Sequence, residues 1–212
     1  MPRDPRSLAE LLADARVWRL KDATAATSRP AWPTGRAALD ARLPDGGWPT
    51  AALVEVLLAG HGLGEVQLFL PALLAGGAER EAGGGRWLIW IAPPYEPYAP
   101  ALAQQGLDLR RFLVVRPASG VEALWAAEQA LQSGACTAVF LWLKGSDLRW
   151  LRRLKLAAEE GGALGVLFRP EHHRFESSPA NLRLAVSRDA AGLRLELLKV
   201  RGGQPASIAL EP

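Results

Sequence analysis

The feature that most constrains this chain is the stretch from residue 53 to 75, which reads LVEVLLAGHGLGEVQLFLPALLA. An apolar run enters a turn containing Gly60, Gly62 and Gly64, and an apolar-rich segment leaves it. This is the strand–loop–helix outline of a phosphate-binding loop. A working loop also needs a lysine that reaches the β- and γ-phosphates and a Ser or Thr that holds Mg²⁺. Glu65 and Val66 follow Gly64 instead, so we expect the architecture without the nucleotide chemistry.

Glu65 has a second interpretation that concerns the loop itself. A carboxylate at a helix N-terminus is favourable by about 0.3–1 kcal/mol, because it faces the positive end of the helix dipole. Its charge there occupies the position that a phosphate would take, so we expect the loop to be stable while empty.

Length and composition limit the class of protein. The chain has 212 residues, of which 49% are hydrophobic, enough for one α/β domain with a short appendage. The net charge of +3 permits acidic or nucleic-acid partners without requiring them. A single cysteine, Cys136, excludes an intrachain disulfide framework and suits a reducing compartment. The charged N-terminal residues lack a signal-peptide core, and no apolar run is long enough to span a bilayer, so we expect a cytoplasmic protein.

Strands and helices are predicted to alternate along most of the chain. Apolar runs predict strands at 53–58, 86–92, 112–115, 138–143 and 164–168, with helices near 71–77, 98–106, 119–133 and 147–160. Three further strands at 182–187, 193–200 and 208–210 are separated by turns, as in an antiparallel meander. The pattern predicts an α/β fold whose mostly parallel sheet has an antiparallel C-terminal edge.

The first 32 residues are predicted to form a helix and a linker, and residues 33–212 the core domain. Leu8, Leu11, Leu12 and Trp18 fall in the helical segment, where an apolar face packs on the core or docks a partner. Four other tryptophans, Trp87, Trp90, Trp125 and Trp142, lie in apolar runs and are expected in the core. Trp32, Trp48 and Trp150 lie in turns or helix starts, where an exposed one would serve as a partner anchor.

The ordered set of segments resembles the RecA core, and within that superfamily the chain is most similar to the ImuA family. The RecA resemblance rests on TGRAALDARLPDGGWP, the loop at 59–66, RRFLVVRPASGVEALWAAEQALQSGA, AVFLWL and LRLAVSRDAAGLRLELLKVRGG. The phrases LPDGGWP, VEVLL and VWR carry the closer likeness to ImuA, and the SulA-type cell-division inhibitors share the same degenerate core. The likeness implies a RecA-like core and a role beside ImuB and an error-prone copy of the replicative polymerase.

The departures from active RecA imply that the chain is not an enzyme and holds no cofactor. The second core strand ends in Ala92-Pro93-Pro94 where the active proteins have a water-activating glutamate. At the end of the fourth core strand, Trp142 stands where an aspartate would orient Mg²⁺. With the lysine and the Ser/Thr also missing, all four protein contributions to phosphoryl transfer are absent.

The remaining candidate sites are basic or histidine-containing segments. Arg149, Arg152, Arg153 and Lys155 form a basic helix face that is solvated, binds phosphate or docks an acidic partner. His172 and His173 lack a third ligand and make no metal site; we expect a solvated loop, in which they and Arg174 are weak DNA-contact candidates by resemblance to RecA. Lys199 and Arg201 match lysines that reach a neighbour's nucleotide in RecA filaments, and without nucleotide they indicate a solvated strand or a protein contact.

Three functions therefore remain open. The first is a non-catalytic adaptor of the DNA-damage response and translesion synthesis that binds RecA, ImuB or both, with DNA contact undecided. The second is a SulA-like inhibitor that binds the division GTPase FtsZ, which the same core would serve. The third is a divergent ATPase, which equilibrium binding of ATP–Mg²⁺ tests directly.

Overall fold

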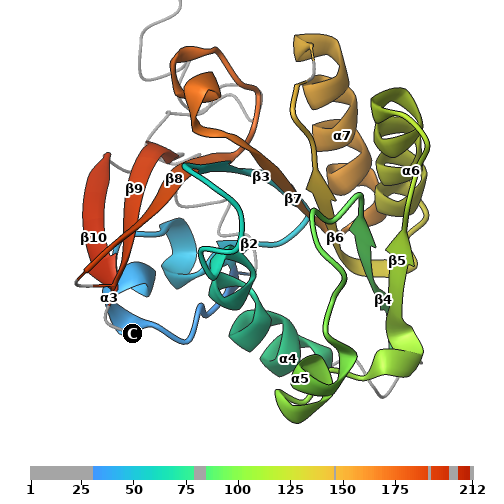
Figure 1. The fold of residues 1–212 in the computed structure, drawn as a ribbon, viewed down its shortest axis with the longest axis horizontal. Helices are drawn as coiled ribbons and strands as arrows, with labels where there is room; N and C mark the ends of the chain where they lie inside the picture. The colour runs from blue at the N-terminus through green and yellow to red at the C-terminus, as the bar shows by residue number, and fades with distance from the viewer. Residues whose placement is uncertain (1–30, 79–84, 146, 191, 201–204, 211–212) are drawn as a thin grey trace, which may run out of the picture.

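The fold is seen in a computed structural model of the chain, which describes residues 31–78, 85–145, 147–190, 192–200 and 205–210 (Figure 1). The strands are β1 (Ala31–Trp32), β2 (Trp48–Pro49), β3 (Ala52–Leu58), β4 (Trp87–Ile91), β5 (Phe112–Val115), β6 (Cys136–Trp142), β7 (Leu164–Pro170), β8 (Leu182–Asp189), β9 (Gly192–Val200) and β10 (Ala206–Leu210). The α-helices are α3 (Ala37–Asp40), α4 (Leu70–Ala78), α5 (Ala99–Gln104), α6 (Gly120–Gln132) and α7 (Leu148–Gly161). Short 3₁₀ helices are η1 (Pro44–Gly46), η2 (Glu65–Leu68), η4 (Leu109–Arg111) and η5 (Glu171–Phe175).

Eight strands form the central sheet in the order β10-β9-β8-β3-β7-β6-β4-β5. The strands from β8 to β5 are mutually parallel, while β9 and β10 run antiparallel at the other side. The expected α/β fold with a mostly parallel sheet and an antiparallel C-terminal edge is therefore confirmed. The sheet stops on one side at β5, a strand of four residues that lies between Arg111 and Pro117.

The sheet is covered on both faces, which explains why its inner strands are apolar throughout. Val54, Val56 and Leu58 of β3 point into a core shared with α4 and α5, whereas Leu53 points into a core shared with α6 and α7. In Figure 1 the pair α6 and α7 lies on one side of the sheet, and α4 and α5 lie on the other. The charged residues in the inner strands, Glu55 of β3, Arg169 of β7 and Arg183 of β8, are consequently buried.

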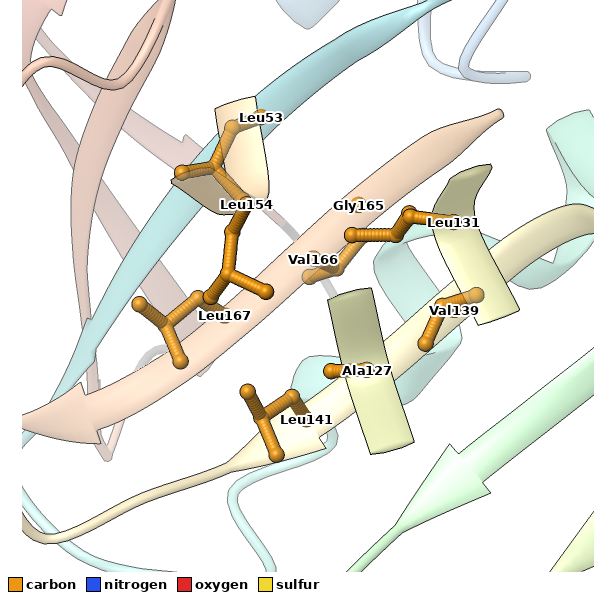
Figure 2. A pocket seen from close by; sticks show the side chains of 9 residues that line it. All are labelled: Leu53, Ala127, Leu131, Val139, Leu141, Leu154, Gly165, Val166 and Leu167. Carbon is orange, nitrogen blue, oxygen red and sulfur yellow. The ribbon is translucent and has the colours of Figure 1, made fainter. Parts of the chain in front are cut away.

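The core under α6 and α7 is tightly packed. Figure 2 shows nine residues around a cavity of about 10 Å³, room for no more than a water molecule. Gly165 of β7 is one of them, and a Cβ built on it would lie 3.1 Å from Leu53 Cδ1 and 3.3 Å from Leu131 Cδ2. This cavity is a packing void and not a ligand site.

Helix ends follow the sequence signals closely. Ser119 caps α6 by accepting from the Glu122 N–H at 3.2 Å, while Glu122 Oε2 accepts from the Ala118 N–H at 2.9 Å. Asp147 caps α7 through the N–H groups of Arg149 and Trp150. Gly134 (φ 69°) and Gly162 (φ 64°) follow α6 and α7 in the left-handed region where glycine is favoured.

Several local expectations need correction. Helix α4 spans Leu70–Ala78, one residue longer at each end than the predicted helix near 71–77. Trp125 and Trp87, expected in the core, are 58% and 38% exposed, because they lie on the solvent side of α6 and at the start of β4. Trp48, a candidate exposed anchor, is fully buried: it stacks on Phe69 at 4.4 Å and donates from Nε1 to the Leu68 carbonyl at 2.9 Å.

The predicted N-terminal unit overlaps the described residues only at its end. Ala31–Trp32, assigned to the linker, form β1, which pairs antiparallel with β2. Leu8, Leu11, Leu12 and Trp18 lie outside the described residues.

Candidate functional site

The glycine loop follows β3 at the carboxyl edge of the parallel sheet. Gly62 (φ 75°) and Gly64 (φ 94°) both take left-handed backbone conformations, and Gly60 is exposed. Arg188 of β8 holds the loop from outside, since its Nε and Nη2 donate to the Leu63 carbonyl at 3.0 and 2.9 Å. The loop is thus fixed by a guanidinium that the sequence analysis did not single out.

Glu65 turns back into the loop that precedes it. The residue is 4% exposed, and its Oε1 lies 3.4 Å from the backbone N of Gly62, which donates to it. Val66 is half-buried and packs against the core on the α4 side. The Glu65 carboxylate therefore accepts a hydrogen bond from a loop N–H that could otherwise bind an anion such as phosphate. The position after Gly64, where a phosphate-binding loop has its lysine, is Glu65 itself.

Beside this loop, the carboxyl ends of several parallel strands surround a pocket of about 640 Å³. Its walls include His61 after β3, Ala92 after β4, and Pro117–Gly120 with Ala123 at the start of α6. Trp142 at the end of β6, Leu143–Gly145 after it, and Pro170 at the end of β7 complete the walls. This edge is where open α/β sheets place their ligands. None of the described residues that line the pocket is an Asp or a Glu.

Trp142 is buried in an aromatic stack. Its ring lies 4.6 Å from that of Phe168 at an interplanar angle of 20°, and 5.5 Å from that of Trp90. The indole is 6% exposed and fills the strand end with apolar volume.

A buried ionic cluster links three neighbouring strands, and the sequence analysis missed it. We define the cluster as Glu55 of β3, Arg169 of β7, Arg183 of β8, His173 and Glu176. Glu55 Oε1 accepts from Arg169 Nη1 and its Oε2 from Arg183 Nε, both at 2.7 Å, and the side chains of Glu55 and Arg169 are fully buried. The available signal was a charged residue inside each of three apolar strand sequences.

His173 belongs to this cluster, so the expectation of a solvated histidine pair is wrong for it. His173 is 8% exposed, whereas His172 is exposed. His173 Nε2 lies 2.7 Å from the Lys144 carbonyl, an acceptor, so Nε2 carries a proton. Nδ1 lies 2.9 Å from Arg169 Nη2 and 2.8 Å from Glu176 Oε1. The hydrogen bond between His173 and Glu176, followed by that from Arg169, lowers the pKa of Glu176.

Arg174 is engaged with acidic neighbours. Its Nη1 lies 3.1 Å from Glu171 Oε1 and its Nη2 lies 2.8 Å from Glu196 Oε1. Both ion pairs raise the pKa of Arg174, and the hydrogen bond to Glu196 has the largest effect. The guanidinium is therefore not a free cation for a DNA phosphate.

Most of the predicted basic face of α7 is also neutralised. Arg149 pairs with Asp147 at 2.9 Å, Lys155 with Glu159 at 4.0 Å, and Arg153 Nε with Glu128 Oε1 at 2.8 Å. Arg153 also lies over the Trp150 ring. Arg152 alone of the four has no ion pair within the described part of the chain.

Lys199 is exposed and donates to the Ser178 carbonyl at 2.9 Å. Partial desolvation of its amino group, followed by repulsion from Lys155 and Arg183, lowers the pKa of Lys199. Arg201, the second residue of this predicted pair, lies outside the described residues. Among the residues described, no three His, Cys, Asp or Glu side chains gather as metal ligands, and no helix has the length and apolarity to cross a bilayer.

The structure is that of an α/β protein in which Glu65, Val66, Ala92 and Trp142 stand where nucleotide-hydrolysing relatives of RecA carry their functional residues. Comparison with known proteins identifies the family to which the chain belongs. The family model "Cell division inhibitor SulA" matches residues 61–165. Protein ImuA of Caulobacter vibrioides is 29% identical over 87% of this chain and 84% of its own length. Cell division inhibitor SulA of Serratia proteamaculans is 34% identical over 55% of this chain and 67% of its own length. The crystal structure of SulA from Pseudomonas aeruginosa is 28% identical and covers 55% of this chain and 97% of that one, with a TM-score of 0.44.

The chain belongs to the ImuA/SulA-like family, as the resemblance predicted. It is a SulA-like protein of the DNA-damage response.

Proposed function

We propose that the chain is a non-catalytic, RecA-like accessory protein that supports error-prone translesion synthesis. It acts in the cytoplasm with ImuB and an error-prone replicative-type polymerase, and it binds RecA, ImuB or both directly. The observation that carries this proposal is Glu65, whose carboxylate lies on the N–H of Gly62 where a phosphate would have to bind. A second anion at that place is repelled by the first.

The extent of similarity supports the ImuA side of the family. The alignment to Protein ImuA of Caulobacter vibrioides covers 87% of this chain, well beyond the part that matches the SulA model. The RecA-like assignment is supported by a glycine loop at the carboxyl end of a central parallel strand, with η2 and then α4 after it.

The second candidate is inhibition of cell division by binding FtsZ. The family model named for that activity matches residues 61–165, which include the glycine loop from His61 onward, β4 to β6 and α4 to α7. The same core serves either function, so only partner binding separates them.

A binding screen with the purified full chain tests both candidates. We expect RecA or ImuB to bind in the presence and absence of ATP, FtsZ not to bind, and calorimetry to give no dissociation constant for ATP–Mg²⁺ below about 1 mM. Binding to FtsZ alone would favour the second candidate. Micromolar ATP–Mg²⁺ binding that is lost on substitution of Gly62 or Gly64 would contradict the non-catalytic proposal.

A further inference from the structure

The segment η5 presents one phenylalanine almost entirely to solvent. Phe175 is 91% exposed, more than any other large hydrophobic residue in the described part of the chain. Burial of such a large apolar side chain is favourable, and in this chain Phe175 does not obtain that stabilisation. The other aromatic residues near this level, Tyr98 and Tyr95, are 71% and 65% exposed and follow β4.

The backbone that carries Phe175 is held rigidly. The guanidinium of Arg183 donates to the carbonyl oxygens of His173 and Glu176 at 3.0 and 2.9 Å, and its Nη1 lies 3.4 Å from that of Arg174. These residues flank Phe175 on both sides. Arg183 is itself fixed by the fully buried carboxylate of Glu55, which belongs to the central strand β3.

Side-chain contacts close the segment further. Glu176 Oε2 accepts from Arg169 Nη2 at 3.1 Å, and His173 joins the loop after β6 through the Lys144 carbonyl. An exposed loop is normally free to move, but here three buried strands determine its shape. A backbone segment that is fixed before binding loses less entropy on association, which raises affinity.

The cluster is difficult to explain by stability alone. Removing the charges of Glu55, Arg169 and Arg183 from water is costly, and apolar residues of similar volume often give a fold that is as stable or more so. What these charges add here is geometry, because they connect the sheet to the carbonyl groups around Phe175.

We propose that Phe175 is an anchor residue that inserts into an apolar pocket on a partner protein. The inference rests on the proposed function and assigns a surface to the partner contact that the function requires. Exposed aromatic residues fixed in place are typical of the few positions that carry most of the binding free energy in protein interfaces.

The charges around Phe175 favour a protein over a nucleic acid. Nucleic-acid binding depends on cations that neutralise phosphates. Arg174 is paired with Glu171 and Glu196, and Arg169 and Arg183 point into the cluster. Lys199, beside the end of this loop, donates to the Ser178 carbonyl. Apart from Lys199, the cations around this loop are paired with carboxylates, so the surface combines an apolar tip with mostly neutralised charges.

The test compares Phe175→Ala with Leu156→Ala in the full chain. Leu156 is 63% exposed on α7 and serves as the matched control for loss of an exposed apolar side chain. Each protein is titrated by calorimetry with whichever of RecA, ImuB or FtsZ binds the unsubstituted chain, and by fluorescence anisotropy with a labelled single-stranded oligothymidine. Melting curves verify that both variants fold.

We expect Phe175→Ala to weaken binding of the partner protein by about 30-fold or more, and Leu156→Ala to change it less than about threefold. Equal affinity of the Phe175→Ala variant and the unsubstituted chain would overturn the anchor while leaving the proposed function intact. An unsubstituted chain that binds none of the three proteins would overturn both. Loss of oligothymidine binding in place of protein binding would assign the surface to nucleic acid and overturn the inference.

Discussion

Two glutamates show how much depends on single residues in this chain. The role of Glu65 could be inferred from the sequence because its hydrogen-bond donor, the N–H of Gly62, lies only three residues away. That of Glu176 could not, because its partners Arg169 and His173 are brought to it by the end of β7 and the turn of η5. The sequence indicated a carboxylate at the anion position of the loop but not its contact with Gly62, and it did not indicate the contacts of Glu176. The same reason accounts for His173, which was expected in solvent and is buried.

The ionisation of Glu176 makes the stability of η5 depend on pH. Its pKa is lowered from the ordinary value of 4.5, chiefly by the hydrogen bond from His173. The unfolded chain therefore takes up this proton first as the pH falls. The stabilisation is fully present above about pH 4.5 and is lost as the pH falls through the lower pKa of the folded state.

We expect Glu176→Gln to lower the melting temperature at pH 7 by a few degrees and to reduce the difference in melting temperature between pH 7 and pH 3.5. The side chain is 52% exposed, so screening keeps the effect small. The control is Glu171→Gln, which removes a carboxylate from the same segment without touching His173. Identical pH profiles for the Glu176→Gln and unsubstituted proteins would contradict this role.

At the scale of elements, most helices and strands were predicted because their signals are local. The cap at Ser119, the glycine stop at Gly134 and the four-residue strand at Phe112–Val115 all agree with the sequence. The exposure of Trp125 was not predictable in this way. Its place on α6 depends on which face meets the sheet and α7, and an alanine-rich helix leaves that choice open.

The contact between α6 and α7 depends on one glycine that sequence patterns mark only as a helix stop. A Cβ on Gly161 would lie 1.9 Å from the Leu131 carbonyl oxygen, which belongs to the α6 backbone and cannot rotate away. Alanine improves helix propensity by at most about 1 kcal/mol, which is less than the cost of separating the helices.

We expect Gly161→Ala to destabilise the fold by about 1–3 kcal/mol or more, measured by urea denaturation. Gly60→Ala is the matched control, since nothing lies within 4 Å of its Cβ position and its φ is not in the left-handed region. A Gly161→Ala variant as stable as Gly60→Ala would show that the two helices are not in this close contact.

At the scale of the whole molecule, the order of strands decides what the charges do. Glu55 and Arg183 are 128 residues apart in sequence, yet they are directly paired across β3 and β8. A sequence that predicts the correct set of strands says nothing of which strands are neighbours. The alternation of elements predicted the fold class, whereas the ionic cluster required the topology.

The cluster predicts opposite effects for single and combined substitutions. Glu55→Gln leaves two arginines without their buried partner and should destabilise the fold by about 3–5 kcal/mol. The combination of Glu55→Leu, Arg169→Met and Arg183→Met removes every unpaired charge and should restore most of that stability. Hydrogen exchange should nevertheless be faster at residues 173–176 in the triple variant, because their carbonyls lose Arg183. A triple variant less stable than Glu55→Gln, or one with unchanged exchange, would contradict this account.

The short border strand β5 has a consequence for the chain in a crowded cell. Open strand edges invite backbone pairing with foreign chains, and the risk grows with the length of uninterrupted edge. The edge strand β5 has only four residues and is soon followed by Pro117, whose nitrogen cannot donate a hydrogen bond. The strand begins directly after the charged residues Arg110 and Arg111. This arrangement would benefit a protein that accumulates under stress, because such a short edge offers few backbone groups with which another chain could pair and start to aggregate.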